Sequence, residues 1–186
     1  MRRVVHGVGV AGENHFSLFG LPEQFSQDSD ALERTWRVLA AKVHPDRYET
    51  ATPAEKRLAM QWASTVNEAY RVLKSPLDRA RYLCELAGHD VQAESNTRMD
   101  GAFLMLQMEW RERLDEAREA GDAGLLDELE NEIEQARADM QAAVATLIDG
   151  RDDRAAAGAK VREWMFIEKM SREVQAARHV LTDRQN

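Results

Sequence analysis

Apolar residues in this chain recur at intervals of three and four positions, and this spacing limits the possible folds more than any other feature of the sequence. In the first half the residues concerned are Leu32, Trp36, Leu39 and Val43, then Leu58, Trp62, Val66, Ala69 and Leu73. Such spacing places apolar side chains on one face of an α-helix. No segment shows the sustained alternation of a half-buried strand. The sequence therefore predicts an all-α fold.

Capping residues and prolines set the expected ends of the first helices. The apolar segment 16–21 is expected to form a short helix or turn that packs on the helices after it. Asp28 or Ser29 can cap the next helix. That helix must end near Val43, because the residue before Pro45 is pushed out of the α region.

A second amphipathic helix is expected after a polar loop. Thr52 is a good N-cap, and Pro53 suits the first helical position. Two helices of about four turns joined by a short loop pack antiparallel and bury their apolar faces against each other. A further apolar-rich piece runs from Pro76 to a stop at Gly88. We therefore expect one helical domain over residues 14–88.

The second half predicts three more helices, over residues 98–120, 124–148 and 159–182. Their short connections favour an up-down-up bundle occupying residues 98–186. Residues 1–13 are expected to be a flexible tail, and the polar segment 89–97 a linker. The residues expected to face inward are Phe103, Leu106, Trp110, Leu114 and Ala117, then Leu125, Leu129, Ile133, Ala136, Met140, Ala143 and Leu147, then Val161, Trp164, Ile167 and Val174.

Charge is distributed unevenly and argues against nucleic-acid binding. Of the 186 residues, 1–90 carry 12 basic and 12 acidic side chains, whereas 91–186 carry 13 basic and 21 acidic ones. A nucleic-acid partner would require a basic face. No apolar stretch approaches the roughly 18 residues of a membrane span, and the opening segment lacks the features of a signal peptide. We expect a cytoplasmic protein with no nucleic-acid or membrane partner.

The sequence contains no motif typical of an enzyme. It has no glycine-rich phosphate loop, no GxSxG and no HExxH, and no two histidines at helical spacing could share a metal. Cys84 is the single cysteine, which excludes an internal disulfide and a Cys-pair zinc site, and its neighbours suggest a helix core. We expect no catalytic residue, no metal and no cofactor. The histidines expected to be surface or capping groups are His6, His15, His89 and His179.

The tripeptide His44-Pro45-Asp46 lies between the two expected antiparallel helices, with basic residues on the exposed side of the helix before it. Taken alone, it can be a simple helix-ending turn, and the basic residues can be an ordinary solvated face. The apolar spacing on both sides and the segment NEAYRVLKSPLDRARY add independent constraints. With them, this part of the chain resembles the J-domain family.

The resemblance implies a four-helix module that docks on a DnaK-type heat-shock chaperone and stimulates its ATP hydrolysis. A basic helix face can steer and orient an acidic partner, while a proline-fixed loop presents an imidazole and a carboxylate in a defined geometry. The implied chaperone-binding residues are His44, Pro45 and Asp46 in the loop and Arg34, Arg37, Lys42 and Arg47 on the basic surface.

The order of segments along the chain narrows the resemblance to one family of J-domain proteins. SLFGLP near the start, PLDRARYLCELAG at the junction and an acidic helical bundle after a short linker resemble the HscB family, co-chaperones of iron-sulfur cluster biogenesis. This resemblance covers nearly the whole chain from residue 14 onward. It implies two partners, a specialised HscA-like DnaK-type chaperone and an IscU-like iron-sulfur cluster scaffold protein. Eukaryotic relatives carry metal-binding cysteine pairs in an N-terminal extension, so their absence here implies a bacterial, metal-free form.

The first helix of the bundle has more apolar surface than a three-helix core requires. Leu104, Met105 and Met108 lie off its inward stripe, and Phe166 lies off that of the third helix. Such an excess marks a binding face, although a wide core is the alternative. The resemblance implies that the iron-sulfur scaffold docks on the segment FLMLQMEWRERL, through Leu104, Met105, Met108, Glu109, Glu112 and Phe166. Trp110 and Arg113 are bulkier or more basic than the family pattern, which could alter packing or affinity.

Two further functions stay open at this point. A J-domain protein that recruits an unrelated client would keep the His-Pro-Asp loop without binding the scaffold. A non-chaperone helical scaffolding protein would use the same tripeptide only as a turn. The leading interpretation is an adaptor that joins scaffold and chaperone and catalyses no reaction of its own.

Overall fold

A computed structural model describes residues 14–48, 50–91 and 99–185 of the chain. These residues form helices joined by turns and irregular segments and include no strand, so the predicted all-α class is confirmed. The chain divides into two compact units, Met1–Arg79 and Ala80–Asn186. The predicted tail 1–13 and residues 92–97 of the predicted linker lie outside the described residues.

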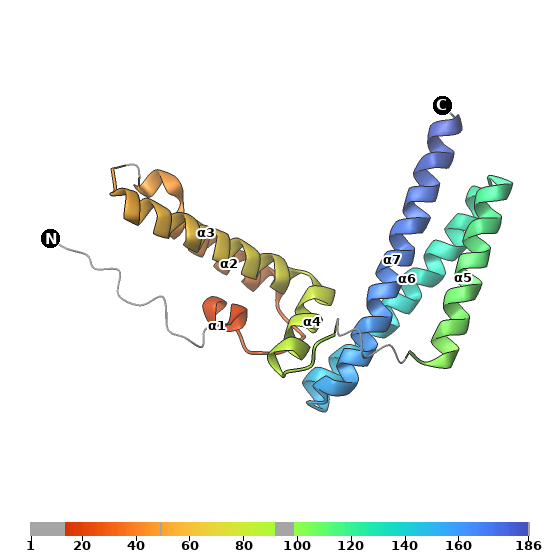
Figure 1. Ribbon diagram of the computed structural model, residues 1–186, viewed down its shortest axis with the longest axis horizontal. Coiled ribbons are helices and arrows are strands. Elements are labelled where there is room, and N and C mark those ends of the chain that lie inside the picture. The colour runs from red at the N-terminus through yellow and green to blue at the C-terminus, as the bar shows by residue number, and fades with distance from the viewer. Residues whose placement is uncertain (1–13, 49, 92–98, 186) are drawn as a thin grey trace. The chain divides into compact units, whose positions relative to one another are not determined.

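The first unit is built on a helical hairpin. Its elements are α1 (His15–Phe19), α2 (Ser29–Val43), the short 3-10 helix η1 (Pro45–Tyr48) and α3 (Pro53–Lys74), followed by α4 (Pro76–Leu86). α2 and α3 lie side by side, and α1 packs against both of them (Figure 1). The expected antiparallel pair is confirmed.

Side-chain caps place the ends of these helices where the sequence predicts them. The Asp28 carboxylate accepts hydrogen bonds from the backbone N–H groups of Asp30 and Ala31. At the start of α3, Thr52 and Glu55 form a reciprocal capping box. Both arrangements satisfy N–H groups that have no partner inside the helix.

The core of the first unit differs from the sequence prediction at the beginning of α3. Leu58 was expected to face inward, but it is 55% exposed, whereas Ala59 is only 5% exposed. Neighbouring residues on a helix point about 100° apart, so an inward Ala59 turns Leu58 toward solvent. The buried apolar residues of this unit are Phe16, Phe19, Phe25, Leu32, Ala59, Val66, Ala69, Val72 and Leu73.

The second unit contains the predicted three-helix bundle. Its long helices are α5 (Gly101–Ala120), α6 (Ala123–Ala145) and α7 (Arg154–Gln185), and a π-helical turn, η2 (Thr146–Gly150), extends α6. Each helix contacts the other two (Figure 1). α7 begins before the expected residue 159, because the Asp153 carboxylate accepts a hydrogen bond from the Ala156 N–H and caps the helix.

The bundle core confirms most of the expected inward residues, including Leu129 and Ile133 of α6, and corrects others on that helix. Phe103, Trp110, Leu114 and Ala117 of α5 are buried, and so are all four predicted residues of α7. Leu106 is partly exposed. On α6 the fully buried residues also include Leu126 and Val144, which were not predicted. The predicted residues that are only partly buried are Leu125, Ala136, Met140, Ala143 and Leu147. α6 packs against two helices, and the π-helical turn shifts the register near its end.

In the described parts of the chain, no helix is both long and apolar enough to cross a membrane.

Candidate functional sites

The first candidate site is the turn that follows α2. His44 leaves the helix in an extended conformation, with φ −60° and ψ 133°, as expected for a residue before proline. Both His44 and Asp46 are exposed, and the His44 Nδ1 lies 3.4 Å from Asp46 Oδ2. The Asp46 backbone N–H also points at Nδ1, over 3.4 Å. Both contacts use Nδ1, so neither engages the Nε2 edge of the imidazole.

Two side chains tie this turn back to the end of α2. The Arg47 Nη1 donates to the Ala41 carbonyl over 3.3 Å, and the Tyr48 hydroxyl donates to the Lys42 carbonyl over the same distance. The last carbonyls of a helix have no partner inside it. Arg47 and Tyr48 therefore fix the turn and satisfy the helix end together. Sequence reasoning missed Tyr48 in this role.

The basic surface expected beside the turn is present. Arg34, Arg37, Lys42 and Arg47 are all exposed, and Arg37 forms an ion pair with Glu33 one helical turn away. Val38 lies on the same outward face of α2 and is 56% exposed. Val38 is not among the predicted site residues, and its position off the inward stripe of α2 is the signal in the sequence that points to it.

Contacts between α2 and α3 hold the basic face and the turn in place. The Trp36 indole N–H donates to Asn67 Oδ1 over 3.0 Å. The Trp36 ring stacks on Tyr70 with centroids 4.6 Å apart, and the Lys74 ammonium lies 5.4 Å from the Tyr70 centroid. These contacts hold α2 in one orientation against α3 and so determine which face of α2 is exposed.

The second candidate site is the outward face of α5. Leu104, Met105 and Met108 are 45%, 66% and 59% exposed, as the sequence predicts. Glu109 and Glu112 are exposed as well. At 3.6 residues per turn, these five side chains fall within an arc of about 140°, opposite the buried stripe. They form one apolar surface with an acidic border, called here the α5 face.

Phe166 is less exposed than the sequence predicts. It is partly buried on α7, and its ring meets that of Phe103 edge to face, with centroids 6.0 Å apart. Phe103 is buried and directly precedes Leu104 in α5. An aromatic pair across two helices buries part of each ring, which accounts for the difference. Phe166 therefore adjoins the first turn of α5, and it is not a freely exposed anchor.

The two unusual residues of α5, Trp110 and Arg113, turn toward α6. Trp110 is fully buried, and its indole N–H donates to Glu132 Oε1 over 2.8 Å. Arg113 donates to the other oxygen of the same carboxylate. Both side chains serve helix packing and lie off the α5 face.

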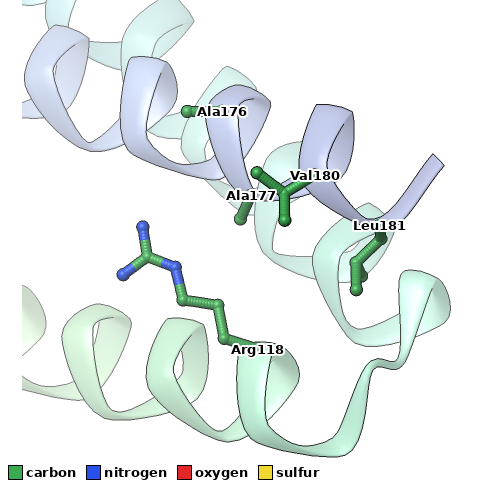
Figure 2. A pocket seen from close by; sticks show the side chains of 5 residues that line it. All are labelled: Arg118, Ala176, Ala177, Val180 and Leu181. Carbon is green, nitrogen blue, oxygen red and sulfur yellow. The ribbon is translucent and has the colours of Figure 1, made fainter. Parts of the chain in front are cut away.

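A groove lies between α5 and α7 toward the ends of both helices, and its cavity measures about 280 Å³. Figure 2 shows Arg118 of α5 opposite four residues of α7, Ala176, Ala177, Val180 and Leu181. The Arg118 guanidinium also lies 3.4 Å from Asp115. None of the predicted site residues lines this groove.

Potential catalytic groups do not converge in the described residues. No cluster of three or more His, Cys, Asp or Glu side chains there could hold a metal ion. Cys84 is buried, as the sequence predicts, and burial raises the pKa of its thiol to about 11. At neutral pH it is almost wholly in the unreactive thiol form.

Comparisons with known proteins match both halves of the chain to described families. Residues 14–82 match a family described as the DnaJ domain, and residues 99–175 match one described as the HSCB C-terminal oligomerisation domain. The co-chaperone protein HscB homolog of Bordetella petrii is 62% identical over 169 residues, covering 91% of this chain and 98% of the relative. The Ralstonia nicotianae homolog is 48% identical over 173 residues, with 93% and 98% covered.

Solved structures show the same fold. The chaperone HscB from Vibrio cholerae superimposes with a TM-score of 0.79 at 33% identity, covering 91% of this chain and 99% of that one. Human co-chaperone protein HscB gives 0.84 at 24% identity, covering 90% and 83%. The curated relatives are named co-chaperones, and a J-domain co-chaperone regulates the activity of a chaperone and does not itself act as an enzyme. The chain belongs to the HscB family of J-domain co-chaperones.

Proposed function

We propose that this co-chaperone binds an iron-sulfur cluster scaffold protein on the α5 face and delivers it to a specialised DnaK-type chaperone, whose ATPase it stimulates. The maturation of iron-sulfur proteins is the process that this activity serves. The expected cytoplasmic location belongs to the same proposal. So do the predicted domain limits, 14–88 for the J-domain and 98–186 for the bundle.

One observation carries the chaperone part of the proposal. The exposed His44 and Asp46 lie at the end of a helix whose outward face presents Arg34, Arg37 and Lys42. Such a face attracts an acidic partner surface and orients it during encounter. The turn, held by Arg47 and Tyr48, then presents an imidazole edge and a carboxylate in a fixed arrangement. These features suit docking on a protein.

The α5 face supports the scaffold part. Leu104, Met105 and Met108 expose large apolar side chains next to each other on one helix, which is unusual for a surface with no partner. Methionine adapts to the shape of a partner, and the acidic border formed by Glu109 and Glu112 limits which partners fit. Phe166 extends the apolar surface at the start of α5.

The ATPase assay tests the first part. Steady-state ATP turnover by the cognate DnaK-type chaperone is measured alone, with this chain, and with this chain plus scaffold. We expect stimulation by the chain and a further increase with scaffold. The variant H44Q should retain its helicity and lose stimulation. H179Q replaces an exposed histidine on α7 and should behave as wild type. Full stimulation by H44Q would refute the role given to the turn.

Calorimetry with the scaffold tests the second part. The triple variant L104A/M105A/F166A is expected to bind the scaffold at least about tenfold more weakly, because it removes the centre of an apolar contact. V180A is the matched control, since Val180 is a half-exposed apolar residue in the same unit, away from the α5 face. Unchanged affinity of the triple variant would reject the surface. Chaperone stimulation without any scaffold binding would indicate an unrelated client.

A further inference from the structure

The methionines of this chain differ sharply in exposure. Met105 and Met108 are 66% and 59% exposed, whereas Met170 in the bundle core is 1% exposed. Met60, on α3 of the first unit, is 65% exposed and belongs to neither proposed docking surface. Two of the most accessible thioethers therefore lie three residues apart on the α5 face.

A thioether is also the oxidisable form of an apolar side chain. Oxidation to the sulfoxide adds a polar, strongly hydrogen-bonding oxygen to a flexible side chain. When a surface is buried against a partner, such an oxygen loses its hydration unless the partner supplies a donor. The same conversion at a solvent-exposed position with no partner costs little. The position of a methionine relative to the α5 face thus decides whether oxidation affects binding.

The other sulfur group of the chain competes poorly for oxidant. Cys84 is fully buried, and burial raises the pKa of its thiol to about 11. Thiols react with peroxides through the thiolate, which is scarce at that pKa. The exposed methionines are therefore the accessible sulfur targets among the described residues.

We propose that Met105 and Met108 form an oxidation-sensitive site, at which peroxide converts both thioethers to sulfoxides and weakens docking of the scaffold. This inference rests on the proposed function of the α5 face. In each step a sulfur lone pair attacks one oxygen of hydrogen peroxide. The S–O bond forms and the O–O bond breaks. The other oxygen leaves as water after it takes up the proton that the transferred oxygen releases. Sulfur loses two electrons, and the peroxide gains them. A thiol-dependent sulfoxide reductase reverses the change, forming a disulfide and water.

The proposal has a reciprocal consequence. If the docked scaffold covers Met105 and Met108, it must slow their oxidation, because peroxide then reaches only the unbound fraction. Oxidation of Met60 must continue at its original rate, since Met60 lies outside the α5 face. Met60 is thus an internal control for peroxide strength and for general unfolding.

The experiment treats the full chain with hydrogen peroxide, with and without a saturating amount of the cognate scaffold protein. Peptide mass spectrometry follows each methionine over time. We expect Met60, Met105 and Met108 to oxidise faster than the buried Met170 in the free chain. Scaffold should slow Met105 and Met108 at least about fivefold and leave Met60 unchanged. Equal rates at Met105 and Met108 with and without scaffold would overturn the proposal.

Calorimetry then compares scaffold affinity before and after peroxide treatment. We expect oxidation of the wild-type chain to weaken binding about tenfold or more, and a sulfoxide reductase with dithiol to restore it. In M105L/M108L the scaffold affinity should change by less than about twofold on peroxide treatment. This holds whatever the affinity of the untreated variant is. M60L should remain as sensitive as the wild type. If peroxide leaves the scaffold affinity of the wild type unchanged, the oxidation-sensitive site is refuted and the proposed scaffold function is not. If the untreated chain does not bind the scaffold at all, the proposed scaffold function is refuted.

Discussion

At the scale of single residues, the bundle places polar groups opposite partners that are distant in sequence. The buried indole N–H of Trp110 donates to Glu132, and Arg113 donates to the same carboxylate. Burial by itself raises the pKa of Glu132, but the hydrogen bonds from Trp110 and Arg113 outweigh it, and the pKa lies below the ordinary 4.5. Stability should therefore respond both to substitution of Glu132 and to pH.

Two substitutions separate the role of Glu132 as a hydrogen-bond acceptor from the role of its charge. In E132L the Trp110 N–H is left buried without an acceptor, so we expect the free energy of unfolding to fall by about 2 kcal/mol. E132Q keeps an acceptor for Trp110 and removes only a partly exposed charge, so the expected loss is below about 1 kcal/mol. Urea denaturation followed by circular dichroism measures both. Equal losses would show that the Trp110 hydrogen bond contributes nothing specific.

The lowered pKa of Glu132 also predicts a pH dependence. A carboxyl group whose pKa is lower in the folded state contributes stability above its unfolded pKa, and this is lost as pH falls through the folded pKa. The advantage of the wild type over E132Q should thus be complete at neutral pH and should fade below about pH 4.5. Thermal melts of both proteins across this range provide the measurement. A difference that stays constant with pH would contradict the assignment.

At the scale of elements, a cluster around Arg137 joins α6 to α7. The Arg137 guanidinium donates to both Glu168 oxygens, the shorter contact being 2.7 Å, and to the Ser171 hydroxyl over 3.0 Å. The Trp164 indole N–H donates to the same Glu168 carboxylate over 3.0 Å. Arg137 also pairs with Glu134 on its own helix. Glu168, the partner of Arg137 on α7, is more buried than Glu134, its partner on α6.

Loss of this cluster should loosen the two helices. In R137Q the partly buried Glu168 loses its cationic partner, and we expect the free energy of opening α6 and α7 to fall by about 2 kcal/mol. E134Q is the matched control, because an exposed pair within one helix contributes only about 0.5 kcal/mol or less. Native-state hydrogen exchange of α6 and α7 peptides measures the effect. Similar exchange in R137Q and E134Q would contradict the proposed role of the cluster.

The elements also show what sequence alone can predict. The caps Asp28 and Thr52 act on N–H groups within three residues, so the starts of α2 and α3 followed from local sequence. The exposure of Leu104 and Met105 followed from helical spacing. By contrast, the exposure of Leu58 and the partial burial of Phe166 depend on how one helix meets another. The partner of Trp110 is 22 residues away, and no local signal points to it.

At the scale of the whole molecule, the two proposed docking surfaces belong to different units of one chain. His44 and Asp46 lie in the first unit, and the α5 face lies in the second. Joining two binding modules in one chain raises the local concentration of one partner near the other, without any contact between the modules. The covalent connection itself is then part of the proposed function.

Mixing two defective variants tests that connection. H44Q is expected to lose chaperone stimulation, and L104A/M105A/F166A is expected to lose most of its scaffold binding, so each variant keeps one of the two proposed surfaces. If one chain must hold both partners, an equimolar mixture should recover less than about a tenth of the scaffold-dependent ATPase increase of the wild type. Steady-state ATP turnover measures it. Full recovery would mean that chains associate and share surfaces, as the name of the matched oligomerisation domain suggests for its relatives.

The anchoring of the turn after α2 affects how this co-chaperone can diverge. Arg47 and Tyr48 bond to the backbone carbonyls of Ala41 and Lys42, and these atoms are the same whatever side chains the two positions carry. A change of side chain at 41 or 42 leaves both acceptor atoms in place, so the geometry of the loop does not depend on the side chains there. The charge at position 42 can therefore vary with the partner that it meets, whereas Arg47 and Tyr48 are constrained because they supply the donors.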